Sequence, residues 1–249
     1  MECTFIIQAR MGSTRFPGKI LIPFFEGQSI LELLIYKLLQ VPQTSIILAT
    51  SDSVQDDLVA KVAENIGVEV YRGSETDVLD RFIKAAEFYS VRNIIRICSD
   101  NPFLDLSSIL ELIKVASENK ADYISFDIQG RPSIKTHYGF WAEFVTLEAL
   151  RKVAANTAEK IYHEHVTNFI YEHASLFQIH WIKGPVLLQG INNIRLTIDT
   201  ETDFENARKI YAEMRKRTVN PSISEVVNYI KCHPEYSDIM ETQIKLNSK

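Results

Sequence analysis

A short loop near the start of the chain carries the residue types that bind phosphate. Residues 8–19 read QARMGSTRFPGK and follow the apolar, β-branched run of residues 4–7. Glycine lets backbone N–H groups approach phosphate oxygens, and arginine and lysine side chains supply charged donors. Two glycines, hydroxyls and three cations directly after a buried strand therefore predict a site for a nucleotide triphosphate.

The loop differs from the Walker A phosphate loop in two ways. Five residues separate Gly12 from the Gly18-Lys19 pair, where Walker A has four, and Ile20 stands where the magnesium-binding Ser or Thr should be. The next residues are apolar and end in Pro23, so the loop does not run straight into a helix. These differences argue against an ATPase of the P-loop class.

The order of predicted elements is that of an α/β protein. Apolar, β-branched runs predict strands at 4–7, 46–50, 68–71, 93–98, 122–125, 177–182 and 194–198. Apolar residues at helical spacing predict helices at 29–39, 54–66, 76–86, 109–116, 146–155 and 159–171. Capping boxes at Ser29–Glu32, Thr202–Glu205 and Ser222–Glu225, a cap at Thr76 and a stop at Gly67 mark helix ends. This alternation predicts one domain over 1–249, a three-layer α/β/α fold with a mostly parallel sheet.

Polar residues follow several of these strands, and they form one candidate cleft. In open α/β sheets, ligands bind outside the carboxyl ends of the strands. That edge collects residues 8–19, 50–52, 72–74, 99–101 and 199–200. A cationic loop and carboxylates in one cleft call for a metal ion, and an oxygen-only ligand set suits Mg²⁺.

Composition limits the classes of partner and compartment. The chain has 249 residues, 46% of them hydrophobic, and a net charge of −5. That charge argues against nucleic acid as a partner, whereas basic residues confined to one loop fit a small anion. The three cysteines form no CxxC pair, and neither a secretory leader nor a membrane span is recognisable. We therefore expect a cytoplasmic protein with no membrane association.

The opening motif resembles that of the cytidylyltransferase family, which makes CMP-activated acidic sugars such as CMP-Kdo and CMP-sialic acids. Within that family, the opening is most similar to the spore-coat polysaccharide branch. The resemblance covers most of the chain to about residue 212. Four further stretches carry it: YRGSETDVLDRF at 71–82, SDNP at 99–102, EHVTNFI at 164–170 and RLTIDT at 195–200.

The resemblance implies a Rossmann-like nucleotidyltransferase fold and a reaction. A hydroxyl of an acidic sugar would attack the α-phosphorus of CTP and expel pyrophosphate, with positioning and charge stabilisation supplying the rate. Mg²⁺ would be held by Asp100 and Asp199. The implied nucleotide-binding residues are Gln8, Ala9, Arg10, Gly12, Ser13, Arg15, Lys19, Arg72, Ser74 and Arg81, with Arg10, Lys19 and Asp100 as the catalytic groups.

Other implications concern the second substrate and assembly. His165 would contact the sugar acid, and residues 130–145 would form a dimerisation excursion, with His137, Tyr138 and Trp141 packing at the interface of a homodimer. His163 and His165, two apart, point to different sides of a helix and make a poor transition-metal pair. The pathway and the sugar are not specified.

The chain departs from the branch pattern at three places, and alternatives stay open. Ser99 and Asn101 flank Asp100 where the branch usually has Gly and Cys, Phe16 replaces a leucine, and Thr167-Asn168 replaces Thr-Pro. Asp100 and Asp199 could each cap a following helix instead of binding metal, and Asp77 suits a helix N-terminus. A nucleotidyltransferase using another base or a sugar phosphate, a glycosyltransferase, or a non-catalytic nucleotide-binding paralogue are the rival functions.

Overall fold

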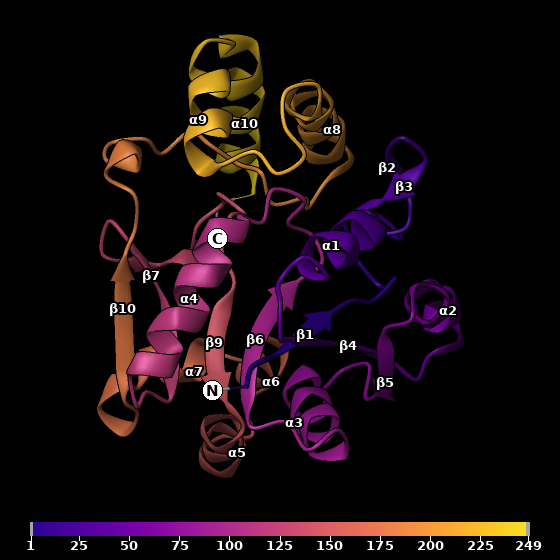
Figure 1. Cartoon of the computed structure of the whole chain (residues 1–249), viewed down its shortest axis with the longest axis vertical. Coiled ribbons are helices and arrows are strands. Elements are labelled where there is room, and N and C mark those ends of the chain that lie inside the picture. Colours follow the sequence, from indigo (N-terminus) through magenta and orange to yellow (C-terminus); the bar gives the residue numbers. More distant parts are fainter. Residues whose placement is uncertain (1, 248–249) are drawn as a thin grey trace.

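A mixed sheet forms the centre of the molecule (Figure 1). The computed structural model describes residues 2–247. In the order in which they pair, the strands of the main path are β10 (Ile179–Lys183), β7 (Tyr123–Ile128), β9 (Glu143–Thr146), β6 (Asn93–Cys98), β1 (Thr4–Gln8), β4 (Ser45–Ser51) and β5 (Glu69–Gly73). The short β8 (Arg131–Pro132) pairs with β7, and β2 (Pro23–Phe25) with β3 (Gln28–Ser29) forms a separate hairpin.

The expected parallel sheet is confirmed around β1. This strand pairs in parallel with both β4 and β6, so that Gln8 lies opposite Ala49 on one side and Cys98 on the other. β4 in turn pairs in parallel with β5. Because these strands end at one edge, the loops that follow them meet there.

Helices cover both faces of the sheet, because alternate residues of each strand point to opposite sides. Phe5 and Ile7 of β1 enter one apolar cluster, and Ile6 enters the other. The first cluster includes residues of α1 (Ile30–Leu38), α2 (Asp57–Ile66), α4 (Leu106–Glu118), α8 (Glu201–Arg215), α9 (Ile223–Lys231) and α10 (Pro234–Leu246). The second includes residues of α3 (Val78–Phe88), α5 (Leu147–Asn156) and α7 (Asn168–Glu172). The three-layer prediction is therefore correct.

Helix ends follow the capping chemistry, with two corrections. The boxes at Ser29–Glu32 and Ser222–Glu225 are present, and Gly67 ends α2 with φ at +85°. The helix expected to be capped by Thr76 is capped instead by Asp77, which accepts from the Asp80 N–H. Likewise, the cap of α8 is Thr200, two residues before the predicted Thr202.

The capping box of α8 joins Thr200 to Asp203, and the predicted box at Thr202–Glu205 is wrong. Both pairs have the required i, i+3 spacing, so spacing alone could not choose between them. Asp203 is selected because its carboxylate also receives the Arg195 guanidinium.

Two expectations for the second half of the chain are also wrong. Residues 194–198 form an extended segment outside the sheet, and the helix expected over 159–171 breaks into α6 (Lys160–Glu164) and α7 around residues 165–167. β9 was not expected at all. It is antiparallel to both β6 and β7 and lies between them.

The predicted excursion at 130–145 is only partly an excursion. Its end belongs to β9 inside the sheet, and Tyr138, Phe140 and Trp141 are buried within the chain's own core. Tyr138 and Trp141 are therefore not free to pack against a partner as expected. Dimerisation itself stays a prediction.

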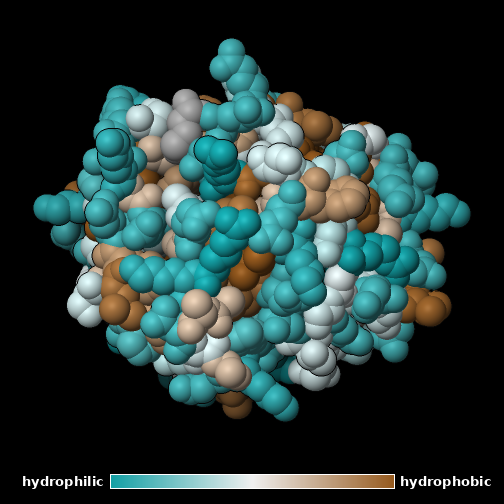
Figure 2. Space-filling model, turned by 90° about the horizontal axis from the view of Figure 1, so that it is seen from below, coloured by the Kyte–Doolittle hydropathy of each residue, from teal (hydrophilic) through white to brown (hydrophobic). Residues whose placement is uncertain are grey.

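The surface seen from below is mostly hydrophilic, with apolar residues in scattered groups (Figure 2). None of the helices within residues 2–247 combines the length and apolar character needed to cross a bilayer.

Candidate active site

The loop after β1 is curled tightly around one carbonyl. The N–H groups of Ser13 and Gly18 both donate to the Met11 carbonyl, at 2.8 and 3.1 Å. Gly18 has φ at +71°, which a residue with a side chain rarely adopts. The loop therefore folds back, which brings its cations Arg15 and Lys19 to the carboxyl edge of the sheet.

Asp56, in the short 3-10 turn that follows β4, anchors this loop. Its Oδ1 accepts from the Met11 N–H at 2.6 Å, and its Oδ2 accepts from the N–H and hydroxyl of Ser51. Asp56 is buried, so these bonds are shielded from water. Sequence reasoning placed Asp56 inside a helix pattern and missed this role; it lies in a short 3-10 turn before α2.

Asp100 and Asp199 converge, although 98 residues of sequence lie between them. The Ile198 N–H donates to the Asp100 carbonyl at 2.9 Å, which joins the two segments directly. The Lys19 ammonium lies between them, 3.5 Å from Asp100 Oδ2 and 4.0 Å from Asp199 Oδ1, and it donates to the Ile198 carbonyl. The predicted meeting of these three groups is thus observed.

Neither aspartate caps the helix that follows it. Asp105 caps α4, and Thr200 caps α8. The helix-capping alternative that the sequence left open for Asp100 and Asp199 is therefore excluded.

Arginines hold Asp199 on both of its oxygens. Arg15 donates to Oδ1 at 2.8 Å, and Arg195 donates to Oδ2 at 2.8 Å. Arg195 is buried and also pairs with Asp203 at 2.8 Å. Burial opposes the charged form of Arg195, but Asp203 and Asp199 outweigh it and raise its pKa. Arg195 is thus a fixed support for Asp199, whereas the half-exposed Arg15 is free to change partners.

Two cavities meet at this cluster. The smaller, of about 300 Å³, is lined by the loop after β1 and by Glu164. The larger, of about 560 Å³, extends toward α6 and α7 and includes Trp141 and Thr136 in its wall. Both are lined by Gln8, Arg15, Cys98, Asp100 and Asp199. A ligand in each cavity would therefore place its reacting end against the two aspartates.

Most of the predicted loop residues line the smaller cavity. Its wall includes Gln8, Arg10, Gly12, Ser13, Arg15 and Lys19. Arg10 reaches the Glu75 carbonyl at 3.4 Å and lies 3.6 Å from the Glu164 carboxylate, so it links the loop to α6. Ala9 is buried below the loop, where its N–H donates to the Ala49 carbonyl at 3.4 Å.

Arg72, Ser74 and Arg81 lie outside both cavities. Arg72 pairs with Asp57 at 2.6 Å and donates to the Ser51 carbonyl at 3.0 Å. Arg81 is fully buried and donates to the Ser74 carbonyl; burial and then the nearby Arg10 lower its pKa. The binding role that the resemblance implies for these three residues stays a prediction.

His163 of α6 and His165, just after that helix, have separate environments. His165 lines the larger cavity, where the sequence placed it. His163 Nδ1 lies 2.7 Å from Asp77 Oδ2. Burial lowers the pKa of His163, but the Thr157 carbonyl and Asp77 outweigh this and raise it. His163 thus ties α6 to the start of α3 and does not face the same ligand as His165.

A buried hydrogen-bond network lies below the larger cavity and is not predicted from the sequence. Arg96 of β6 donates to Glu143 of β9 at 2.6 Å and to the Gln8 amide oxygen at 3.1 Å. Tyr123 and Thr167 also donate to Glu143. The available signal was Arg96 itself, a cation inside the otherwise apolar run of residues 94–97.

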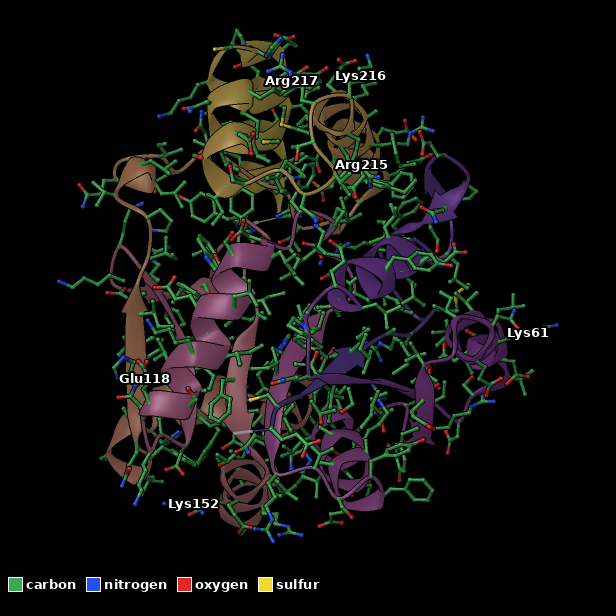
Figure 3. All side chains as sticks on the ribbon, viewed as in Figure 1. Lys61, Glu118, Lys152, Arg215, Lys216 and Arg217 are labelled. Atoms are coloured by element: carbon green, nitrogen blue, oxygen red, sulfur yellow. The ribbon has the colours of Figure 1, made fainter. Side chains whose placement is uncertain are left out.

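A basic run elsewhere does not contribute to this site. Arg215, Lys216 and Arg217 lie at the end of α8, near α9 (Figure 3). Arg215 packs over the Phe25 ring at 4.9 Å, and Arg217 over the Tyr229 ring at 5.7 Å. These cations therefore stabilise the helical end of the molecule.

The donor set suits a magnesium ion better than a transition metal. Within residues 2–247, no group of three or more His, Cys, Asp or Glu side chains could hold a metal ion. Mg²⁺ is commonly held by one or two carboxylates together with water and substrate phosphates. Asp100 and Asp199, beside a cavity suited to phosphate, fit that pattern.

The family model for cytidylyltransferases matches residues 4–225, most of the chain. The chain belongs to the cytidylyltransferase family. One protein to which the chain is similar is the spore coat polysaccharide biosynthesis protein SpsF of Bacillus subtilis. It is 33% identical over 240 residues, which cover 94% of this chain and 96% of SpsF.

Solved structures show the same fold. A cytidylyltransferase from Leptospira borgpetersenii aligns with a TM-score of 0.85 and 27% identity, covering 95% of this chain and 96% of that one. A CMP:2-keto-3-deoxy-manno-octonic acid synthetase solved in complex with CTP aligns with a TM-score of 0.64, covering 86% of this cytidylyltransferase and 99% of the synthetase. At 14% identity, the second alignment supports the fold alone.

Proposed function

We propose that this cytidylyltransferase transfers CMP from CTP to a hydroxyl of an acidic sugar, with release of pyrophosphate, for surface polysaccharide or glycan synthesis. The observation that carries the proposal is the meeting of two cavities at Asp100, Asp199 and Arg15. One cavity has the cations and backbone turns that suit a triphosphate, and the other has room for a second substrate. The name of SpsF, a relative at 33% identity, supports a role in polysaccharide synthesis.

The loop cations supply the charge stabilisation that phosphoryl transfer needs. As the sugar oxygen bonds to the α-phosphorus, the bond from that phosphorus to the bridging oxygen breaks, and negative charge grows on the departing pyrophosphate. Lys19 and Arg15 are placed to meet this charge, because both line the smaller cavity. The hydroxyl proton is released as the new bond forms.

We further propose that Asp100 and Asp199 hold Mg²⁺ beside the α-phosphate. The ion would act as a Lewis acid on the phosphate oxygens when it is bound. Arg195 keeps Asp199 oriented toward the loop, since it holds the other carboxylate oxygen. Arg15 shares Asp199 with Lys19 in the free protein and would turn to the triphosphate when CTP enters.

The first test is a comparison of nucleotides. We expect CTP to raise the melting temperature more than UTP, ATP or GTP, with a larger increase when Mg²⁺ is present. Equal stabilisation by all four nucleotides would contradict the proposed preference for cytosine. The protein would then be a nucleotidyltransferase with a different base specificity.

The decisive test is pyrophosphate release from CTP and Mg²⁺ with a panel of acidic sugars. We expect release with at least one acid and none without an acceptor. If folded, CTP-bound protein releases no pyrophosphate with any acid, the proposed reaction is wrong. Asp100→Asn is the matched inactive control.

A further inference from the structure

The larger cavity is backed by a buried, rigid arginine. Arg96 is 6% exposed, and its guanidinium is paired with Glu143, which is 2% exposed. Glu143 also accepts from Tyr123 and Thr167, so both of its oxygens have partners. A buried charge that has a partner and further hydrogen bonds is held in one geometry, because losing any contact leaves it unpaired.

Arg96 decides which way the Gln8 amide faces. A guanidinium has only donors, so the amide oxygen of Gln8, and not its nitrogen, must face Arg96. The NH₂ group of the planar amide therefore points away from Arg96. Within residues 2–247, this NH₂ has no protein acceptor, and it is not among the buried polar atoms that lack a partner. It is thus a free donor that a ligand can reach.

Gln8 lies where the two substrates meet. It lines both cavities together with Asp100 and Asp199. The phosphate-binding loop begins directly after it, so the smaller cavity already has its own cations for the triphosphate. Because Gln8 also borders the larger cavity, its free amide donor is within reach of the second substrate as well.

The rest of the larger cavity is rich in donors and balanced in charge. Asn168 also lines it, and its amide oxygen is occupied by the Tyr171 hydroxyl, as the Gln8 oxygen is by Arg96. Trp141 lies in the same wall, but its indole N–H is buried and is not counted among these donors. The charged residues in the wall are Arg15, Arg96 and Lys135 against Asp100, Glu172 and Asp199.

Neutral N–H donors suit a carboxylate, which accepts several hydrogen bonds and carries one charge. A phosphate monoester carries nearly two negative charges at neutral pH, and this balanced wall offers no excess of cations to neutralise them. The chemistry of the wall thus favours a carboxylated over a phosphorylated acceptor.

We infer that Gln8, oriented by Arg96 and Glu143, donates its amide N–H to the carboxylate of the second substrate and so selects carboxylated sugars. The inference rests on the proposed function. Arg96 and Glu143 are positioning residues, because they act through Gln8.

The test is Gln8→Glu, assayed by pyrophosphate release with 3-deoxy-manno-octulosonate and a sialic acid, each compared with its carboxamide. The new side chain keeps an oxygen for Arg96 but turns a second oxygen toward the substrate carboxylate. We expect KM for the better acid to rise at least tenfold and the preference for acid over carboxamide to fall by a similar factor. The dissociation constant of CTP should rise by a clearly smaller factor than KM for the acid, although Gln8 also borders the smaller cavity. Gln189→Glu, at an exposed position, is the matched control.

A second variant tests the positioning role. Arg96→Lys keeps a cation beside Glu143 but lacks the fork that reaches both Glu143 and Gln8. We expect the same loss of selectivity while Gln8 is unchanged, with kcat at saturating acid reduced less than KM is raised. Should Arg96→Lys fail to fold, Gln8→Glu and Gln8→Met decide the question.

The outcomes separate this inference from the proposed function. Suppose that the wild type turns over normally. If Gln8→Glu then keeps the wild-type preference for acid over carboxamide, or loses only CTP affinity, the inference is wrong and the proposed function stands. No pyrophosphate from the wild type with any acid removes the proposed function and the inference with it.

Discussion

The Asp56 carboxylate accepts a hydrogen bond from the Met11 N–H at 2.6 Å, across 45 positions of sequence. The same carboxylate receives the Ser51 N–H at 3.2 Å, so one buried side chain links the end of β4 to the loop after β1. The loop thus takes its shape from a neighbouring strand as well as from its own glycines.

Replacing Asp56 is expected to weaken nucleotide binding. Asp56→Ala leaves two backbone donors without their acceptor, at a cost of about 1–3 kcal/mol each where they remain buried. We expect the KM for CTP to rise about tenfold or more, measured by pyrophosphate release, together with a lower melting temperature. Asp57→Ala is the matched control, because the neighbouring Asp57 is exposed and its carboxylate pairs with Arg72 at the surface. Equal effects of the two substitutions would contradict the anchoring role.

The two aspartates at the cavity junction are expected to differ in their effect on stability. Asp100→Asn and Asp199→Asn should each lower kcat/KM about 100-fold or more and raise the Mg²⁺ concentration for half-maximal rate. Only Asp199→Asn should also lower the free energy of unfolding, because it weakens the contact of the buried Arg195 with a carboxylate. Activity titrated with Mg²⁺ and denaturant unfolding measure the two effects. Unchanged Mg²⁺ dependence in both variants would argue against metal binding at this pair.

A buried lysine behind the Asp100 loop is expected to give a pH dependence. Lys37 donates to the carbonyls of Pro102 and Leu104, at 3.2 and 2.8 Å. Burial lowers the pKa of Lys37 to about 8, with Asp105 partly opposing the shift. Between that value and the ordinary 10.5, the unfolded chain holds a proton that the folded chain has lost, so stability should rise with pH across this window.

Unfolding at pH 7.5, 9 and 10 measures this rise. Lys37→Met removes the titrating group and should reduce the rise of the free energy of unfolding with pH. Lys61→Met, on the outer side of α2 (Figure 3), should retain it. The same slope in Lys37→Met as in the wild type would show that another group is responsible.

Gly139 is expected to tolerate no side chain. A Cβ there would lie 3.0 Å from Asn101 Oδ1 and 3.1 Å from the Thr197 backbone nitrogen, and φ is +69°. We expect the positive φ of Gly139→Ala to lower the free energy of unfolding by about 1–3 kcal/mol. The backbone clash should add a further loss. Gly190→Ala shares the positive φ, at +74°, but a Cβ there meets nothing within 4 Å. The difference between the two variants isolates the close approach at Gly139, and equal losses would contradict it.

The parts of the site carried by contiguous sequence could be predicted. Residues 8–19 form the expected loop after the expected strand, and Ser29 and Ser222 cap helices through local i, i+3 contacts. Such features depend on neighbours along the chain, so residue type and spacing suffice to identify them. The choice between Thr200–Asp203 and Thr202–Glu205 shows the limit, because a distant arginine side chain decided it.

Features that depend on distant pairing could not be predicted. β9 is a four-residue strand whose buried Glu143 makes it look unlike a core strand, and only Arg96 on the neighbouring strand explains that residue. Residues 194–198 have the apolar pattern of a strand, but they bond to His137 and Asp100 instead of joining the sheet. That placement is what brings Asp199 to Asp100.

By itself, the sequence determined the α/β class, the cationic glycine-containing loop after the first strand and the two aspartates as candidate site residues, because each depends on a local run of residue types. The tertiary structure alone decided that Asp100 and Asp199 share Lys19, that Asp56 holds the loop and that Arg96 fixes which face of the Gln8 amide turns away from it. These contacts join residues that are far apart in the chain. Their geometry follows from how the strands pair, which no local pattern records.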